Sequence, residues 1–160
     1  MKLLIPSDLS KNAKNALLYT NSIAKAIKGK LILQNIYTPS MGGASPISGI
    51  VAEETAIAMN INQKELNKLR NKYITVASTL IIERGEPVNK ILSAAESNAV
   101  DLIVMGTHGA SGLAKTLFGS NTAKVVLQSN VPVLAINQNY KYKKVNTIVY
   151  ASDLKMLQKN

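Results

Sequence analysis

Cysteine is absent from this chain of 160 residues, and long apolar runs are absent as well. Without cysteine the fold contains neither disulfide bonds nor a cysteine-ligated metal, which suits a reducing compartment. No apolar stretch approaches the roughly 20 residues that a membrane-spanning helix needs. The apolar run after Met1 is too short for a signal peptide and ends at Pro6. These absences predict a cytoplasmic protein without a membrane segment.

Acidic and aromatic residues are few. Aspartate and glutamate number 9 against 19 lysines and arginines, which gives a formal net charge of +10. Such a charge raises the hypothesis of nucleic-acid binding. The lysines are scattered, however, and the aromatic residues, 4% of the chain, are not interleaved with them, so no platform for stacking bases is visible. We expect a basic surface that attracts anionic ligands, and no nucleic-acid partner.

What the sequence does contain is a regular alternation of apolar and amphipathic segments. Five apolar runs predict β-strands over residues 2–5, 30–37, 74–85, 100–106 and 131–136. Segments with helical spacing lie between them, over about 11–28, 50–71, 86–98 and 120–129. Asp8 or Ser10 could cap the first of these helices. In the second, the apolar residues on or near one face are Ile50, Ile57, Ile61, Leu66 and Leu69.

This order predicts an α/β fold: an open five-stranded parallel sheet with helices on both faces, doubly wound. Ligands of such sheets bind beyond the carboxyl ends of the strands, where the strand order reverses. Three features stand at strand carboxyl ends: Asp8 after the first strand, Ile36 in the second, and a glycine-bearing loop after the fourth. We expect them to meet in one crevice.

The loop lies within GTHGASGLAKTLFGSNTAKVV, residues 106–126, which holds four glycines and the only histidine, His108. Backbone without side chains lets N–H groups face a ligand, and the N-terminus of the following helix adds unpaired donors and partial positive charge. Ser120 and Thr122 add hydroxyl groups. The spacing alone leaves two interpretations equally open. The loop binds phosphate, or its glycines only make turns and Ser120 caps the helix.

The two common glycine fingerprints do not fit. A P-loop needs a lysine and a hydroxyl residue directly after its last glycine, where this chain has Ser120 and Asn121. The dinucleotide-binding fingerprint follows a first strand, and PSDLS, residues 6–10, contains no glycine.

The segment VDLIVMGTHGASGLAKTLFGSNTAKVVLQSNVPVLAI, residues 100–136, resembles the carboxyl half of a universal stress protein domain. Nucleotide-binding members of that family carry Gly, two residues, Gly, nine residues, then Gly-Ser or Gly-Thr. Gly106, Gly109, Gly119 and Ser120 match this pattern without a gap. PSD at residues 6–8 is similar to the family's first-strand ending. The resemblance covers about residues 1–137 and implies an adenine nucleotide alpha-hydrolase-like fold that binds ATP.

The resemblance also implies a nucleotide-binding site made of Pro6, Ser7, Asp8, Ile36, Met105, Gly106, His108, Gly109, Gly119, Ser120, Asn121 and Thr122. In it, the turn at Asp8 would hold the ribose or the adenine, and Ile36 would pack against the adenine. The glycine loop and the start of the following helix would receive the phosphates. Bound Mg²⁺ or Mn²⁺ would be held mainly by phosphate oxygens and water, with no protein metal site. Asn35 stands where many members carry histidine.

No catalytic residue is expected. His108 could act as a general base, since the ordinary pKa of histidine is about 6.5, but a lone loop histidine is more often a hydrogen-bonding turn residue. No acidic pair for a metal and no lysine aimed at a γ-phosphate are evident. We therefore predict an ATP-binding stress-response or signalling module with slow or no hydrolysis. The alternative is an ATPase or nucleotidyl-transfer enzyme acting on an unknown substrate.

The fifth predicted strand, residues 131–136, is apolar on both faces and lies at an edge of the inferred sheet. Uncovered sheet edges invite pairing with another strand. The universal stress protein resemblance implies antiparallel pairing of these strands between two domains. We expect a homodimer, or pairing of two domains within one chain.

The end of the chain repeats its beginning. TIVYASDL, residues 147–154, matches KLLIPSDL, residues 2–9, at a constant offset of 145. The polar segment 138–146 predicts a linker, and residues 147–160 predict the start of a truncated second copy of the domain at 1–137. The alternative is an extra strand that decorates the first sheet.

Overall fold

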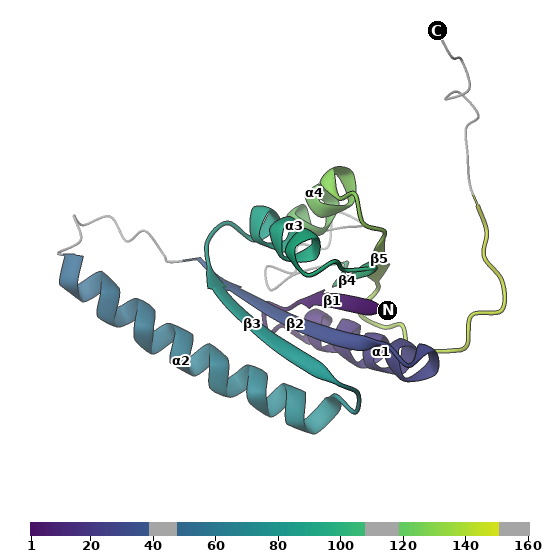
Figure 1. The fold of residues 1–160 in the computed structure, drawn as a ribbon, viewed down its shortest axis with the longest axis horizontal. Helices are drawn as coiled ribbons and strands as arrows, with labels where there is room; N and C mark the ends of the chain where they lie inside the picture. The colour runs from purple at the N-terminus through teal and green to yellow at the C-terminus, as the bar shows by residue number, and fades with distance from the viewer. Residues whose placement is uncertain (39–47, 108–118, 151–160) are drawn as a thin grey trace, which may run out of the picture.

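The computed structural model describes residues 1–38, 48–107 and 119–150, with only the backbone described for 48–55. Strands and helices alternate along the chain (Figure 1). Their bounds are β1 Lys2–Pro6, α1 Lys11–Ile27, β2 Lys30–Tyr37, α2 Ser48–Tyr73, β3 Ser78–Arg84, α3 Pro87–Ser97, β4 Leu102–Gly106, α4 Ser120–Gln128 and β5 Val133–Ile136.

The strands form one five-stranded sheet in the order β3-β2-β1-β4-β5, and every neighbouring pair is parallel. This confirms the predicted α/β fold and the edge position of β5. The chain builds outward from β1 to β3 on one side and from β4 to β5 on the other. The strand order therefore reverses between β1 and β4, which is where sheets of this kind open a crevice at their carboxyl ends.

Helices cover both faces of the sheet: α1 and α2 lie on one face, and α3 and α4 on the other (Figure 1). Successive residues of a strand point to opposite faces. Leu3 and Ile5 accordingly pack in the core under α1 and α2, whereas Leu4 packs with Ile91 and Val125 from α3 and α4. Because both faces are covered, Leu3, Leu4 and Ile5 are each 0% exposed, and β1 is apolar without alternation.

Three strands begin later than predicted. β3 was expected from residue 74 but begins at Ser78, because the amide of Ile74 still donates to the carbonyl of Arg70 in the last turn of α2. β4 and β5 begin at Leu102 and Val133, two residues after their predicted starts. Apolar runs mark these strands, but an apolar residue before a strand does not show whether its amide joins the sheet.

The predicted single apolar face of α2 is buried only toward its C-terminus. Leu66 is 0% exposed and Leu69 packs against the core, whereas Ile57 and Ile61 are 54% and 56% exposed. A helix of 26 residues is about 39 Å long and the seven residues of β3 span about 23 Å, so α2 extends past the sheet (Figure 1). Neither α2 nor another helix in the described ranges has the length and apolarity to cross a membrane.

The segment that follows β5 was expected to be a linker, and its first part packs on α1. The side-chain amide of Asn15 donates to the carbonyls of Asn137 and Tyr140, at 3.0 and 3.1 Å. The ring of Tyr142 meets the buried ring of Tyr19 edge to face, with centroids 5.4 Å apart. We call residues 137–142 the strap. Residues 143–150 beyond it are exposed and belong to no strand.

Candidate functional site

A pocket of about 190 Å³ opens at the carboxyl edge of the sheet, where β1 and β4 end. It is lined by all predicted site residues that the structure describes: Pro6, Ser7, Asp8, Ile36, Met105, Gly106, Gly119, Ser120, Asn121 and Thr122. The three strand ends singled out from the sequence thus meet in one place. His108 and Gly109 lie outside the described residues.

The sequence reasoning missed three residues of the pocket wall, Ala13, Pro87 and Ile91. Ala13 is in the first turn of α1, and Pro87 and Ile91 are one turn apart at the start of α3. A signal for them was available, because every helix that follows a parallel strand begins at the carboxyl edge of the sheet. Pro87 marks such a start, since proline favours the first turn of a helix.

A partly buried polar network holds the α3 wall of the pocket against the sheet. The side-chain amide of Gln34, 0% exposed in β2, donates to the Glu83 carboxylate at 2.9 Å and to the Lys90 carbonyl at 3.1 Å. The Lys90 ammonium lies 3.2 Å from the other Glu83 oxygen. The start of α3, from Pro87 to Ile91, is therefore fixed to β2 and to the end of β3.

The turn after β1 supplies the polar rim. The Ser7 amide donates to the Gln34 carbonyl at 2.7 Å, which extends the β1–β2 pairing by one residue. Asp8 accepts a hydrogen bond from the Ser10 amide at 3.0 Å, and Ser10 in turn caps α1 by accepting from the Ala13 amide at 3.1 Å. Of the two predicted capping residues, Ser10 is therefore the cap. Asp8 shapes the turn and remains exposed at the pocket edge.

The floor of the pocket is a close junction between β4, α1 and α4. A Cβ atom on Gly106 would lie 3.2 Å from the carbonyl carbon and oxygen of Asn12, closer than most Cβ contacts, so a larger residue would require the backbone of β4 or α1 to shift. The hydroxyl of Thr122, a residue 4% exposed, donates to the Gly106 carbonyl at 2.9 Å. Thr122 thus ties the first turn of α4 to the end of β4.

The N-terminus of α4 lines this pocket, and no side chain caps it in the part of the chain that the structure describes. Its N-cap is Gly119, so Ser120 is the first helical residue and does not cap the helix. The Gly119 amide donates to the Thr107 carbonyl, which brings the chain back to β4 after the loop. The next amides, those of residues 120–122, have no partner within the helix and carry the partial positive charge of its N-terminus.

The two sides of the pocket differ in chemistry. Ile36, Ile91 and Met105 make one side apolar, and the helix N-terminus at Ser120 makes the other a donor of hydrogen bonds. This combination suits a ligand with a flat apolar ring and an anionic group. Among the described residues, no three histidine or acidic side chains gather as they would around a metal ion.

Comparison with known proteins agrees with this architecture. The model of the "Universal stress protein family" matches residues 1–137. The chain belongs to the universal stress protein family. Among curated family members, MJ0531 of Methanocaldococcus jannaschii is 30% identical over 147 residues, covering 88% of this chain and 84% of that protein.

Solved structures of the family share the fold. UspA from Lactobacillus plantarum has a TM-score of 0.74 at 24% identity, over 85% of this chain and 97% of that one. A universal stress protein solved in complex with cAMP has a TM-score of 0.62 at 24% identity, over 86% and 97%. For a universal stress protein from Archaeoglobus fulgidus DSM 4304, the TM-score is 0.54 at 26% identity. The match covers 85% of this chain but 43% of that one.

Proposed function

We propose that this protein binds ATP in the crevice between β1 and β4 and acts as a cytoplasmic stress-response or signalling module. The observation that carries the proposal is the uncapped N-terminus of α4, which faces an apolar wall across one pocket. Helix N-termini bind phosphate through unpaired amides and partial charge. The universal stress protein solved with cAMP supports the proposal at the level of the fold, because that ligand also joins adenine to a phosphate.

In the proposed complex, the adenine lies between Ile36 and the turn at Asp8, where Ile91 and Met105 complete the apolar wall. The ribose lies near Asp8, whose carboxylate can accept hydrogen bonds from sugar hydroxyl groups. The phosphates reach Gly119 and Ser120, together with Gly109 of the loop. Mg²⁺ or Mn²⁺ would arrive with the phosphates and be held mainly by their oxygens and by water.

A bulky residue at Gly119 should abolish ATP binding and leave the fold intact. The backbone of Gly119 has φ −63° and ψ 153°, a conformation open to any residue, so a Gly119→Val substitution should fold. Its side chain would then stand where the phosphates must enter. Calorimetry with ATP measures the effect, and Asn130→Val, an exposed site beyond the other end of α4, is the control. Unchanged ATP affinity in a folded Gly119→Val protein would contradict the phosphate assignment. The glycine pattern of the sequence makes the same prediction for Gly109, which lies outside the described residues.

Hydrolysis separates this proposal from its alternative, an ATPase or nucleotidyl-transfer enzyme. A binding module should show single-turnover hydrolysis far below 1 s⁻¹ at saturating ATP, whereas about 1 s⁻¹ lies within the range of enzymes. Nucleotide that co-purifies with the protein would identify the ligand directly. A purified chain that carries a different anionic cofactor in the pocket would overturn the assignment to ATP.

A further inference from the structure

Residues 147–150 have the sequence of a buried strand, yet they lie on the surface. Ile148, Val149 and Tyr150 are 88%, 87% and 88% exposed, whereas the residues that match them in the repeated segment 2–9 are 0% exposed. The apolar pattern is thus buried on both faces at residues 3–5 and on neither face at residues 148–150.

The pattern specifies a position at the centre of a sheet. β1 pairs with β2 on one side and β4 on the other, and helices cover both its faces. Continuous apolar sequence is typical of such strands. The corresponding place in the sheet described above is already occupied, since Leu3 pairs with both Leu31 and Leu102. Residues 147–150 therefore match the centre of a sheet other than this one.

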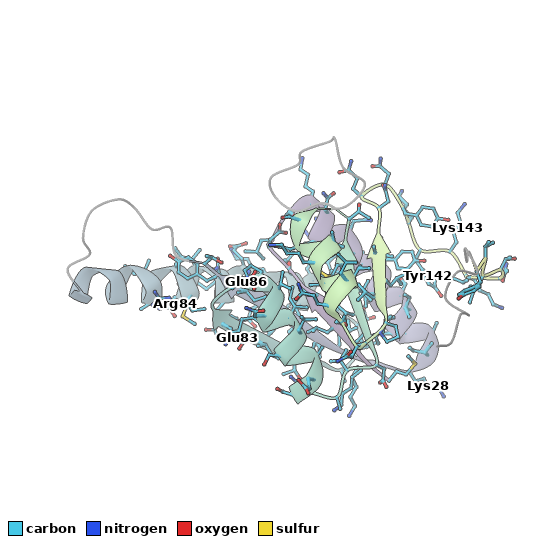
Figure 2. All side chains as sticks on the ribbon, turned by 90° about the horizontal axis from the view of Figure 1, so that it is seen from above. Lys28, Glu83, Arg84, Glu86, Tyr142 and Lys143 are labelled. Carbon is cyan, nitrogen blue, oxygen red and sulfur yellow. The ribbon has the colours of Figure 1, made fainter. Side chains whose placement is uncertain are left out.

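The strap determines where this second strand can begin. Asn15 and Tyr19 hold the chain on α1 as far as Tyr142, and Figure 2 labels Tyr142 together with Lys143, the first residue beyond the strap. From Tyr142 to Thr147 an extended chain reaches at most about 18 Å. A short tether of this kind keeps two units at a high effective concentration.

We propose that residues 147–150 form the first, central strand of a second domain of the same fold, which the strap holds beside the first domain. In the sequence, Ser152 and Asp153 follow residues 147–150 as Ser7 and Asp8 follow the matching residues 2–5. The Archaeoglobus fulgidus chain supports the proposal, because the part that matches is less than half of it. The proposal does not depend on which ligand the first domain binds.

Hydrogen exchange on the monomeric 160-residue chain tests whether the segment belongs to the first sheet. The amides of Ile148, Val149 and Tyr150 should exchange as in an unstructured peptide, while those of Leu3, Leu4 and Ile5 exchange slowly. Slow exchange at 148–150 in the monomer would mean that the segment is a strand of the first sheet, and the proposal would be wrong.

A strand exchange tests the positive claim. Residues 2–9 are replaced by the sequence of residues 147–154 in one chimera, and a second chimera retains Ile5, because the full exchange places tyrosine at a fully buried position. The control carries the residues of segment 147–154 in a shuffled order that breaks the apolar run. At least the chimera that retains Ile5 should unfold in one cooperative transition, and the control should show none. Loss of the transition in both chimeras, or its retention in the control, overturns the proposal.

Discussion

At the scale of single residues, the site depends on how closely β4 approaches the two helices beside it. Gly106 faces the backbone of Asn12 on α1 with no room for an unstrained Cβ atom between them, and its carbonyl accepts a hydrogen bond from the Thr122 hydroxyl on α4. These contacts fix the distance between the strand end and the helix N-terminus, and so the shape of the pocket floor. Small changes at Gly106 or Thr122 should therefore affect both stability and ligand affinity.

Gly106→Ala should lower the free energy of unfolding by about 1–3 kcal/mol, the usual cost of adding a methyl group to a packed site. The added Cβ would lie 3.2 Å from backbone atoms of Asn12, which cannot rotate away as a side chain can. Urea denaturation measures the loss, and ATP affinity should fall with it. Ala56→Ser, which also adds one heavy atom but at an exposed position on α2, should change stability by about 0.5 kcal/mol at most. Equal stability of the two variants would contradict the close approach.

Thr122→Val should cost about 1–3 kcal/mol, because a nearly isosteric side chain leaves the Gly106 carbonyl without its donor. Thr122→Ser keeps the hydroxyl and should retain most of the ATP affinity that Thr122→Val loses. Chemical denaturation and calorimetry on both variants check this. Identical behaviour of valine and serine would show that the hydroxyl does not position α4.

At the scale of helices and strands, the sequence predicted each element but not how far it extends. Apolar runs located all five strands because helices cover both faces of this sheet. A strand buried on both faces is apolar along its length, and the sequence shows this directly. The start of β3 was predicted wrongly, and the exposure of Ile57 and Ile61 on α2 was not predicted, because both depend on where neighbouring elements end. Ala13, Pro87 and Ile91 were missed as pocket residues for a related reason. Their apolar side chains look like core residues until the topology shows which edge they reach.

The packing of the strap on α1 was not predicted, because the sequence NQNYKYKK, residues 137–144, is polar. Tyr142→Ala should destabilise the domain by about 1–2 kcal/mol through loss of the edge-to-face contact with Tyr19 and of buried area. Tyr150→Ala is the matched control, because that ring is 88% exposed, and it should leave the melting temperature unchanged. If the two variants have the same melting temperature, the strap does not pack on α1 in solution.

At the scale of the whole molecule, the edge strand β5 lies beside exposed apolar side chains. Among the described strands, β5 pairs only with β4, and beside it α4 exposes Val126 and Leu127, at 47% and 84%. An apolar edge strand next to exposed apolar side chains favours association. We propose that two domains pair through β5, either as a homodimer or within a longer chain.

Val133→Lys on β5 should convert the assembly to monomers, because a charge at the edge opposes strand pairing. Thr79→Lys places the same charge on the opposite edge strand, β3, at an exposed position, and should leave the assembly intact. Light scattering across a concentration series measures both. A parent protein that is monomeric at high concentration, or dissociation by Thr79→Lys instead, would contradict pairing through β5.

Titration of the ¹⁵N-labelled protein with ATP and Mg²⁺ tests most directly whether the crevice is a nucleotide site. The amide resonances of Gly106, Gly119, Ser120 and Asn121 should shift as ATP saturates, together with that of Ile36 on the apolar side. Inorganic triphosphate should reproduce the shifts at residues 119–121 and not the shift at Ile36. ATP that leaves these amides unmoved at millimolar concentration, or moves only amides elsewhere, would contradict the account.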